Sequence, residues 1–272
     1  MPIRTACLAL VLGLALAPAA RAGTITIVIT QRAELADGKL TVHVQVRNTG
    51  DEAAYSVTPK VVFGDKEARG KSAATLEPNG SVEEDLVVDV GDLKQGRWPY
   101  RVSVDYADAN QYPFQALHAT SYLVGSPPPA KIALPRIASE GIAGTGNVQV
   151  TVKNLGEDAR QVQLQLLAPE GLEATQADDT LDLAPWEETT VTIPVTNRTA
   201  LAGSTYPLFV SVEYDEGDVH QSIVASSTVK ILASDTVLDQ RSQYLWWGAA
   251  ILGVIFVVLA GVRMMRGGPA PA

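Results

Sequence analysis

Two stretches of this 272-residue chain decide its fold: VHVQVRNTGDEA at residues 42–53 and VQVTVKNLGEDA at residues 148–159. In each, valines at every second position alternate with polar residues, and the run ends in Asn-x-Gly. A period of two is typical of a β-strand with one buried and one solvated face, and Asn and Gly mark the turn that ends it. The shared pattern predicts one β-rich unit that is present twice.

The repeat continues beyond these stretches. Residues 76–90 (LEPNGSVEEDLVVDV) match 183–195 (LAPWEETTVTIPV), and 96–106 (GRWPYRVSVDY) match 203–214 (GSTYPLFVSVEY). The offset drifts only from 106 residues, between the two turn asparagines, to 108 residues. A period of this length is a whole domain.

Each copy is expected to contain about seven strands. In the first copy the alternation and the turn residues predict strands near 24–30, 39–48, 55–63, 66–73, 81–90, 99–106 and 113–123. About seven antiparallel strands in ~100 residues indicate a two-sheet sandwich with Greek-key connections. Between the copies, GSPPPAK contains three consecutive prolines. Such a run predicts a stiff, extended linker.

The two ends of the chain are apolar for a different reason. Residues 1–22 combine Arg4, an apolar run and the small-residue site Ala20-Arg21-Ala22, which is the layout of a secretory signal peptide cleaved after Ala22. Residues 244–262 form 19 positions without a charge, enough to cross a bilayer.

The flanks of the second apolar segment predict its orientation. Tyr244, Trp246 and Trp247 stand at its start as interfacial anchors, and Arg263 and Arg266 follow it. Positive charge after the span places that end in the cytoplasm. We therefore expect a single-pass membrane protein whose body lies outside the cytoplasm.

The expected architecture is all-β, with two tandem immunoglobulin-like β-sandwich domains and one C-terminal transmembrane helix. In order, we expect a signal peptide (1–22), a first sandwich (23–124), a Pro-rich linker (125–131), a second sandwich (132–232), a juxtamembrane linker (233–243), the transmembrane helix (244–262) and a cytoplasmic tail (263–272).

Composition narrows the compartment and the partners. Cys7, the single cysteine, lies in the expected signal peptide, so the body has neither disulfides nor cysteine metal sites. Secreted animal domains of this size are usually disulfide-bonded, so this composition favours a bacterial inner membrane with the body in the periplasm. Residues 23–243 hold all 30 acidic residues and 17 of the 21 basic ones, a net charge of −13. That charge argues against nucleic acid and against docking on anionic head groups.

The repeated motifs resemble those of the bacterial and archaeal Ig-like modules known as CARDB, and of the similar APHP type. The resemblance rests on V-x-V-x-N-x-G-[DE]-x-A at 44–53 and 150–159, on L-x-P at 76–78 and 183–185, and on V-S-V-[DE]-Y at 102–106 and 210–214. It implies an adhesion, spacer or accessory role at the cell surface, and it implies no catalytic residues.

A search for chemistry yields little. The sequence contains neither a Gly-rich phosphate loop nor a G-x-S-x-G elbow, so we expect no enzyme and no cofactor. His43, His118 and His220 are expected to be solvated strand residues rather than metal ligands. The acidic hairpin turns leave weak Ca²⁺ binding open, since oxygen-rich loops can hold that ion; they contain Asp105, Asp108, Asn110, Glu213, Asp215, Glu216 and Asp218.

Aromatic residues give the one candidate interaction patch, Trp98, Tyr112 and Phe114. The hypothesis from the sequence is a membrane-anchored interaction or scaffold protein, an accessory subunit of an envelope transport or surface-assembly system whose partner is another envelope or membrane protein. The alternative is a polysaccharide or cell-wall binding or adhesion module, with a carbohydrate ligand.

Overall fold

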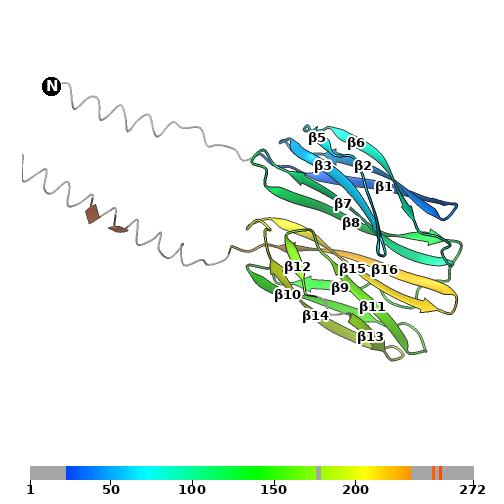
Figure 1. The fold of residues 1–272 in the computed structure, drawn as a ribbon. Helices are drawn as coiled ribbons and strands as arrows, with labels where there is room; N and C mark the ends of the chain where they lie inside the picture. The colour runs from blue at the N-terminus through cyan, green and yellow to red at the C-terminus, as the bar shows by residue number, and fades with distance from the viewer. Residues whose placement is uncertain (1–22, 176–178, 234–246, 249–250, 253–272) are drawn as a thin grey trace, which may run out of the picture.

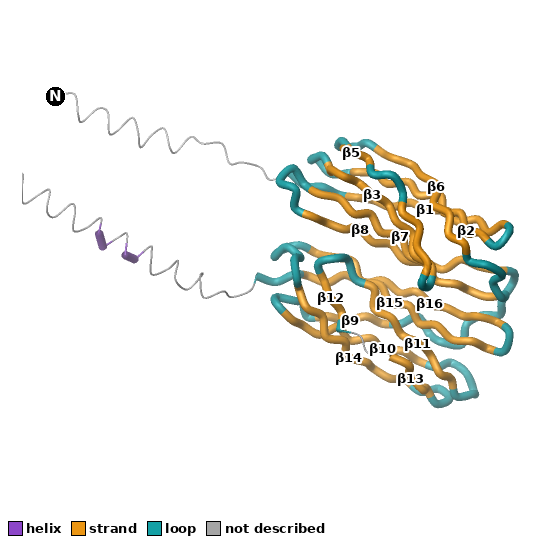
Figure 2. The backbone as a smooth tube through the Cα atoms, in the orientation of Figure 1, coloured by secondary structure: helices purple, strands orange, loops and turns teal. Residues whose placement is uncertain are grey.

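The computed structural model describes residues 23–175 and 179–233, together with two short helical fragments at 247–248 and 251–252. The described body is built of strands joined by short loops (Figure 2). The strands of the first half are β1 (Ile27–Ala36), β2 (Lys39–Asn48), β3 (Ala54–Phe63), β4 (Lys66–Arg69), β5 (Ala73–Leu76), β6 (Ser81–Asp89), β7 (Gly96–Ala107) and β8 (Pro113–Val124). Those of the second half are β9 (Arg136–Ser139), β10 (Thr145–Lys153), β11 (Arg160–Leu167), β12 (Leu172–Ala174), β13 (Asp179–Leu183), β14 (Glu188–Asn197), β15 (Thr205–Glu216) and β16 (Val219–Lys230).

Each half is a two-sheet sandwich, so the expected all-β fold is confirmed (Figure 1). In the first half, β1-β2-β6 faces β4-β3-β7-β8, with β5 also paired to β3. In the second half, β9-β10-β14-β12 faces β13-β11-β15-β16. This division of the strands, with the first, second and fifth main strands in one sheet and the third, sixth and seventh in the other, is the immunoglobulin-like order.

Two strands depart from the sequence expectation. β1 runs on past residue 30 to Ala36, because Asp37 and Gly38 form a two-residue turn with φ of 50° and 70° and return the chain into β2. The single strand expected at 66–73 is two short strands, β4 and β5, separated where the Gly70 amide donates to the Pro59 carbonyl. The copies also diverge here, because β4 pairs with β3 whereas its counterpart β12 pairs with β14 in the opposite sheet.

Each sandwich has its own core, made of the inward-facing residues of the alternating strands. The cores are lined mostly by Val and Leu, from Leu40 to Val104 in the first half and from Ile132 to Ile231 in the second. Val42, Val61, Val102, Val148, Val150 and Val210 are fully buried. Dense aliphatic packing between the two sheets of each sandwich accounts for the folding of a body without disulfides.

The repeated asparagine explains why the motif ends in Asn-x-Gly. Asn48 and Asn154 are both fully buried at the end of their strands. The side-chain amide of Asn48 donates to the carbonyl of Leu76, the leucine of the first L-x-P motif, and its oxygen accepts the Gly50 amide. Asn154 makes the same bonds to Leu183 and Gly156. A buried amide that is satisfied in this way fixes the turn to the other sheet.

The two sandwiches are joined by strand pairing as well as by the linker. β7 and β16 run parallel where Gly96 pairs with His220. We call the end of the body that contains Gly96 and His220 the far end, and the end that contains Ala107 and Lys230 the near end. The carbonyl of Pro128 in the linker accepts bonds from the Arg97 guanidinium at 2.9 Å and the Gln221 amide at 3.1 Å. The linker is thereby held against both halves.

Several expected segments lie outside the described residues: the signal peptide 1–22, most of the juxtamembrane linker and of the span 244–262, and the tail 263–272. Of the expected anchor residues, Trp247 belongs to a described helical fragment and is exposed, whereas Tyr244, Trp246, Arg263 and Arg266 fall outside. Within the described part of the chain, no helix has the length and apolar character needed to cross a membrane.

A charge placed at Val150 tests the register. Val150 is fully buried between the sheets, whereas the adjacent Gln149 is exposed. Val150→Asp should destabilise the second sandwich by roughly 3–5 kcal/mol, because an unpaired carboxylate would enter the core. Gln149→Asp is the matched control and should change stability by less than about 1 kcal/mol. Thermal unfolding followed by circular dichroism measures both, and equal melting temperatures for the two variants would refute the register.

Candidate functional site

The outward faces of two sheets, one from each sandwich, lie against each other. Alternation places Leu117 and Ala119 of β8 on the outside of the first sandwich, and Leu167 of β11 and Phe209 of β15 on the outside of the second. These four residues are all buried and form a third apolar cluster, with Val224 packed against it. Their burial means that each sandwich covers a face that would otherwise be solvated.

Small polar residues surround that cluster. Ser103, Ser211 and Ser222 are almost fully buried, although all three lie in outward-facing positions of their strands. The hydroxyl of Ser222 lies 2.8 Å from that of Ser121 in the other sandwich. Short side chains of this kind let the two sheets approach closely, and a hydrogen bond between the hydroxyls removes the cost of burying them.

At the far end the contact between the sandwiches involves the backbone itself. The His220 amide donates to the Gln95 carbonyl at 3.0 Å. Gly96 has φ of 154°, and a Cβ at this position would run into the His220 carbonyl. Only glycine fits this approach. The His220 ring also stacks on Trp98, with ring centroids 3.9 Å apart.

The His220 ring is held by two carboxylates. Its Nδ1 lies 2.9 Å from Asp215, and its Nε2 lies 3.4 Å from Glu213. Burial by itself would lower the pKa of His220, but the bonds and charges of Glu213 and Asp215 outweigh it, and the pKa is raised above its ordinary value. The two carboxylates, which belong to the same hairpin as His220, therefore favour the protonated ring in spite of its burial.

The expectation that the histidines are solvated is wrong for two of the three. The His220 side chain is only 12% exposed. His118 is half-buried, bonded to Gln31 at 2.9 Å, and 5.8 Å from the Phe209 ring of the other sandwich; burial lowers its pKa. Both differ from expectation because the sandwiches fold onto one another. His43 remains partly exposed, 2.5 Å from Asp85.

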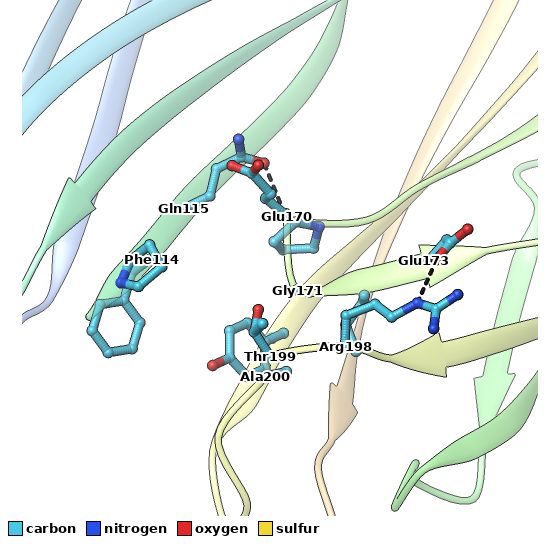
Figure 3. Close-up of a pocket in the computed structure, with 12 residues that line it drawn as sticks. Phe114, Gln115, Glu170, Gly171, Glu173, Arg198, Thr199 and Ala200 are labelled. Carbon is cyan, nitrogen blue, oxygen red and sulfur yellow. Dashed lines mark hydrogen bonds and ion pairs between the residues drawn. The ribbon is translucent and has the colours of Figure 1, made fainter. Parts of the chain in front are cut away.

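At the near end the two sandwiches do not close completely, and a cavity of about 470 Å³ lies between them. Figure 3 shows Phe114 and Gln115 on one side, and Glu170, Gly171, Arg198 and Ala200 on the other. The lining is mainly apolar, with Pro113, Phe114, Pro169, Leu172, Ala200 and Tyr206. The Glu170 amide donates to the Gln115 side chain across the cavity, and the Glu173–Arg198 ion pair (2.6 Å) stands at its edge.

Two further hollows continue from this cavity along the boundary. One of about 350 Å³ shares Gln115 and Leu172 with it, and is also lined by Lys60, Arg101 and Ser103. Another of about 130 Å³ shares Arg101, Gln165 and Leu167 with the second, and reaches Trp98 at the far end. Because neighbours share lining residues, the three form one groove, which we call the interdomain groove. It is apolar at the near end and basic in the middle.

The expected patch residues all lie at this boundary; Tyr112 and Phe114 are neighbours, with ring centroids 5.2 Å apart, whereas Trp98 is separate from them. Phe114 lines the apolar cavity, and the Tyr112 hydroxyl bonds the carbonyl of Thr199 in the other sandwich. Trp98 lies at the far end of the same hairpin, where it stacks on His220 and on Phe63. Sequence reasoning missed Lys60 and Arg101, because basic residues on the polar face of a strand give no signal that distinguishes a groove from open solvent.

The acidic hairpin turns are engaged in local contacts. Asp108 accepts the amides of Asn110 and Tyr112 and so closes its own turn. Glu216 pairs with Lys131 at 3.0 Å and Arg160 at 3.1 Å, and those partners lower its pKa. Across the described residues, no group of three or more His, Cys, Asp or Glu side chains gathers as a metal site would require. Weak Ca²⁺ binding at the turns remains a prediction.

Comparison with known proteins gives little beyond the fold. No family model matches the chain, and no curated protein matches it. The chain is similar to the native conformation of E. coli alpha-2-macroglobulin at 14% identity and a TM-score of 0.30, covering 76% of this chain and 17% of that one. It is similar to Salmonella alpha-2-macroglobulin reacted with methylamine, at 14% identity and a TM-score of 0.32; the match covers 77% of this chain and 16% of that one. It is similar to the YadV chaperone, at 13% identity and a TM-score of 0.31; the match covers 75% of this chain and 99% of that one.

The chain thus spans less than a fifth of the length of either macroglobulin. The order of the strands in the two sheets of each sandwich is the basis for calling the fold immunoglobulin-like.

Titration of His220 should be visible in the stability of the protein. Because its folded pKa is raised, its stabilising contribution is fully present below the unfolded pKa of ~6.5 and is lost as the pH rises through the folded value. The melting temperature of the unmodified protein should therefore exceed that of His220→Gln most at about pH 5.5, and the difference should shrink towards pH 9. His118 titrates in both proteins and cancels in the difference. A difference that grows with pH would contradict the assignment.

Proposed function

We propose that this chain is a membrane-anchored, extracytoplasmic interaction or scaffold protein, an accessory subunit of an envelope transport or surface-assembly system of a bacterial inner membrane. The proposed location in the cell comes from the sequence: residues 1–22 resemble a signal peptide, and residues 244–262 form an uncharged stretch long enough to span a membrane. The CARDB-like motifs support an accessory role. The described body supports it by being one unit rather than two independent modules.

The observation that carries the proposal is the near-end cavity, because both sandwiches are needed to build it. It lies at the end of the body from which the chain leaves, since Tyr206 in its lining pairs with Val229, just before the end of β16. Ten residues lie between Ala233 and the start of the predicted span at Tyr244, so the two positions are at most ~40 Å apart along an extended chain. A partner in the same membrane is within reach of this end.

The carbohydrate alternative has less support. A sugar-binding aromatic needs a free ring face, and the Trp98 ring is stacked on His220, with Phe63 as a second ring neighbour 6.1 Å away. Trp186 is exposed, with φ of 61°, but it stands in the Leu183-Ala184-Pro185 turn at the far end, away from the groove. Among the described residues, no second aromatic ring stacks on Trp186.

Site-specific photocrosslinking in cells that express the full chain tests the proposal. A photoreactive amino acid at Leu201, which is exposed beside Tyr206 at the near end, should form adducts with an integral membrane protein. The same amino acid at Trp186, which is more exposed but lies at the far end, is the matched control and should form few. Removing residues 244–272 should abolish the Leu201 adducts and release the body from membranes. Protein adducts of equal yield from both positions would contradict a near-end partner.

A further inference from the structure

The interface between the sandwiches is built twice, and its two ends differ. At the far end, the start of β16 pairs in parallel with the start of β7, and His220 is the partner of Gly96. At the near end, the equivalent strands are β8 and β15, and the repeat aligns Gly203 with Gly96. A Cβ on Gly96 would strike the backbone of the other sandwich, whereas a Cβ on Gly203 would meet nothing within 4 Å. The close backbone approach at the far end therefore has no counterpart at Gly203, and the near end instead contains the cavity between the sandwiches.

The open space is suited to an apolar group. Its volume of about 470 Å³ lies in the range of small-molecule pockets, ~300–1,000 Å³. Pro169 and Leu172 in its lining are buried, and Phe114 and Tyr206 contribute aromatic faces from the two sandwiches. Of its two acidic lining residues, Glu173 is neutralised by Arg198, and Glu170 is exposed to solvent. An apolar chain placed here would lose water from both sides at once.

The adjoining hollow carries the opposite chemistry. Its charged lining residues are Lys60 and Arg101, and no carboxylate lines it. Among the described residues, neither side chain has a hydrogen bond or an ion pair; the exposed Glu67 acts on Arg101 only through its charge. Two cations without a carboxylate partner can attract an anion into this recess, although the body as a whole carries a net charge of −13.

We infer that the interdomain groove binds a single-chain anionic amphiphile, with its acyl chain in the near-end cavity and its anionic head at Lys60 and Arg101. The two parts adjoin at Gln115 and Leu172, which line both. The strong negative charge of the body disfavours docking on a bilayer surface, but a single anion in a basic recess avoids most of that repulsion. Free fatty acid and anionic lysophospholipid share this chemistry. The inference does not depend on a protein partner.

Photolabelling of the full chain tests this inference. The protein is placed in nanodiscs of zwitterionic phospholipid and exposed to a 16-carbon fatty acid that carries a diazirine in its chain and a terminal alkyne. Mass spectrometry of the captured peptides should find adducts on the segments around Phe114 and around Leu172 to Tyr206. Adducts on residues 244–262 report the label dissolved in the bilayer and serve as an internal reference.

Competition and variants separate the two parts of the site. Palmitic acid should prevent formation of the cavity adducts at a concentration at least tenfold lower than hexadecanol needs. Lys60→Gln should raise the concentration of palmitic acid for half-maximal competition roughly tenfold, the size expected for losing one charge-assisted hydrogen bond. Lys39→Gln, an exposed lysine outside the groove, should change nothing. Ala200→Trp should fill the cavity and remove the adducts while the circular-dichroism melting curve is retained.

Lysophosphatidylglycerol in the nanodiscs should reduce labelling if a single-chain membrane lipid is the source, and leave it unchanged if free acid is. Cavity peptides that stay unlabelled while the reference is labelled would overturn the inference. So would hexadecanol competing as well as palmitic acid, or displacement by millimolar inorganic phosphate alone, since either result would remove one half of the amphiphile from the site.

Discussion

The contact between the outward faces of two sheets, one from each sandwich, is the constraint on which the rest of the structure depends. Leu117 and Ala119 on one side, and Leu167 and Phe209 on the other, are buried only because the sandwiches cover each other. Around them, buried serines keep the sheets close, and Gly96 admits the backbone of His220. Without this contact neither the groove nor the near-end cavity would exist.

The same contact changes the surroundings of individual side chains. An imidazole on the polar face of an isolated sandwich would be solvated, but His220 lies between Trp98 and two carboxylates and is favoured in its charged form. Lys60 and Arg101 would be ordinary surface cations, but they line a recess instead. The proposed binding of an amphiphile is thus a property of the pair of sandwiches, whereas the raised pKa of His220 comes from the carboxylates of its own hairpin. A linker held at Pro128 from both sides is consistent with a pair that moves as one body.

The strands and cores could be predicted from the sequence because their signal is local. Alternating valines marked the inward faces, and the repeated Asn-x-Gly marked the turns that Asn48 and Asn154 fasten to the opposite sheet. Local signals also account for the errors: the Asp37-Gly38 turn lengthened β1, and the chain around Gly70 divided one expected strand into two. Where β4 and β12 pair with different sheets, the sequence alone carries no marker of the choice.

The groove could not be predicted for a physical reason. Ser103, Ser121, Ser211 and Ser222 occupy the polar half of an alternating pattern, and that pattern is the same whether water or another sheet covers it. Trp98, Tyr112 and Phe114 did stand out as aromatics, and they lie at the boundary, yet Trp98 and Tyr112 contact the second sandwich of the same chain rather than a separate partner. Residues far apart in the sequence define the site, so only the three-dimensional arrangement reveals it.

A disulfide across the boundary tests this arrangement most directly. The hydroxyl oxygens of Ser121 and Ser222 lie 2.8 Å apart, so cysteines at both positions are close enough to bridge. With Cys7, the one cysteine of the sequence, changed to serine, the variant Ser121→Cys/Ser222→Cys of the full chain should oxidise nearly completely within one molecule. It should then migrate faster without reductant, whereas each single variant should not. Free thiols that persist under oxidising conditions, in a variant that melts as a folded protein, would contradict the face-to-face packing.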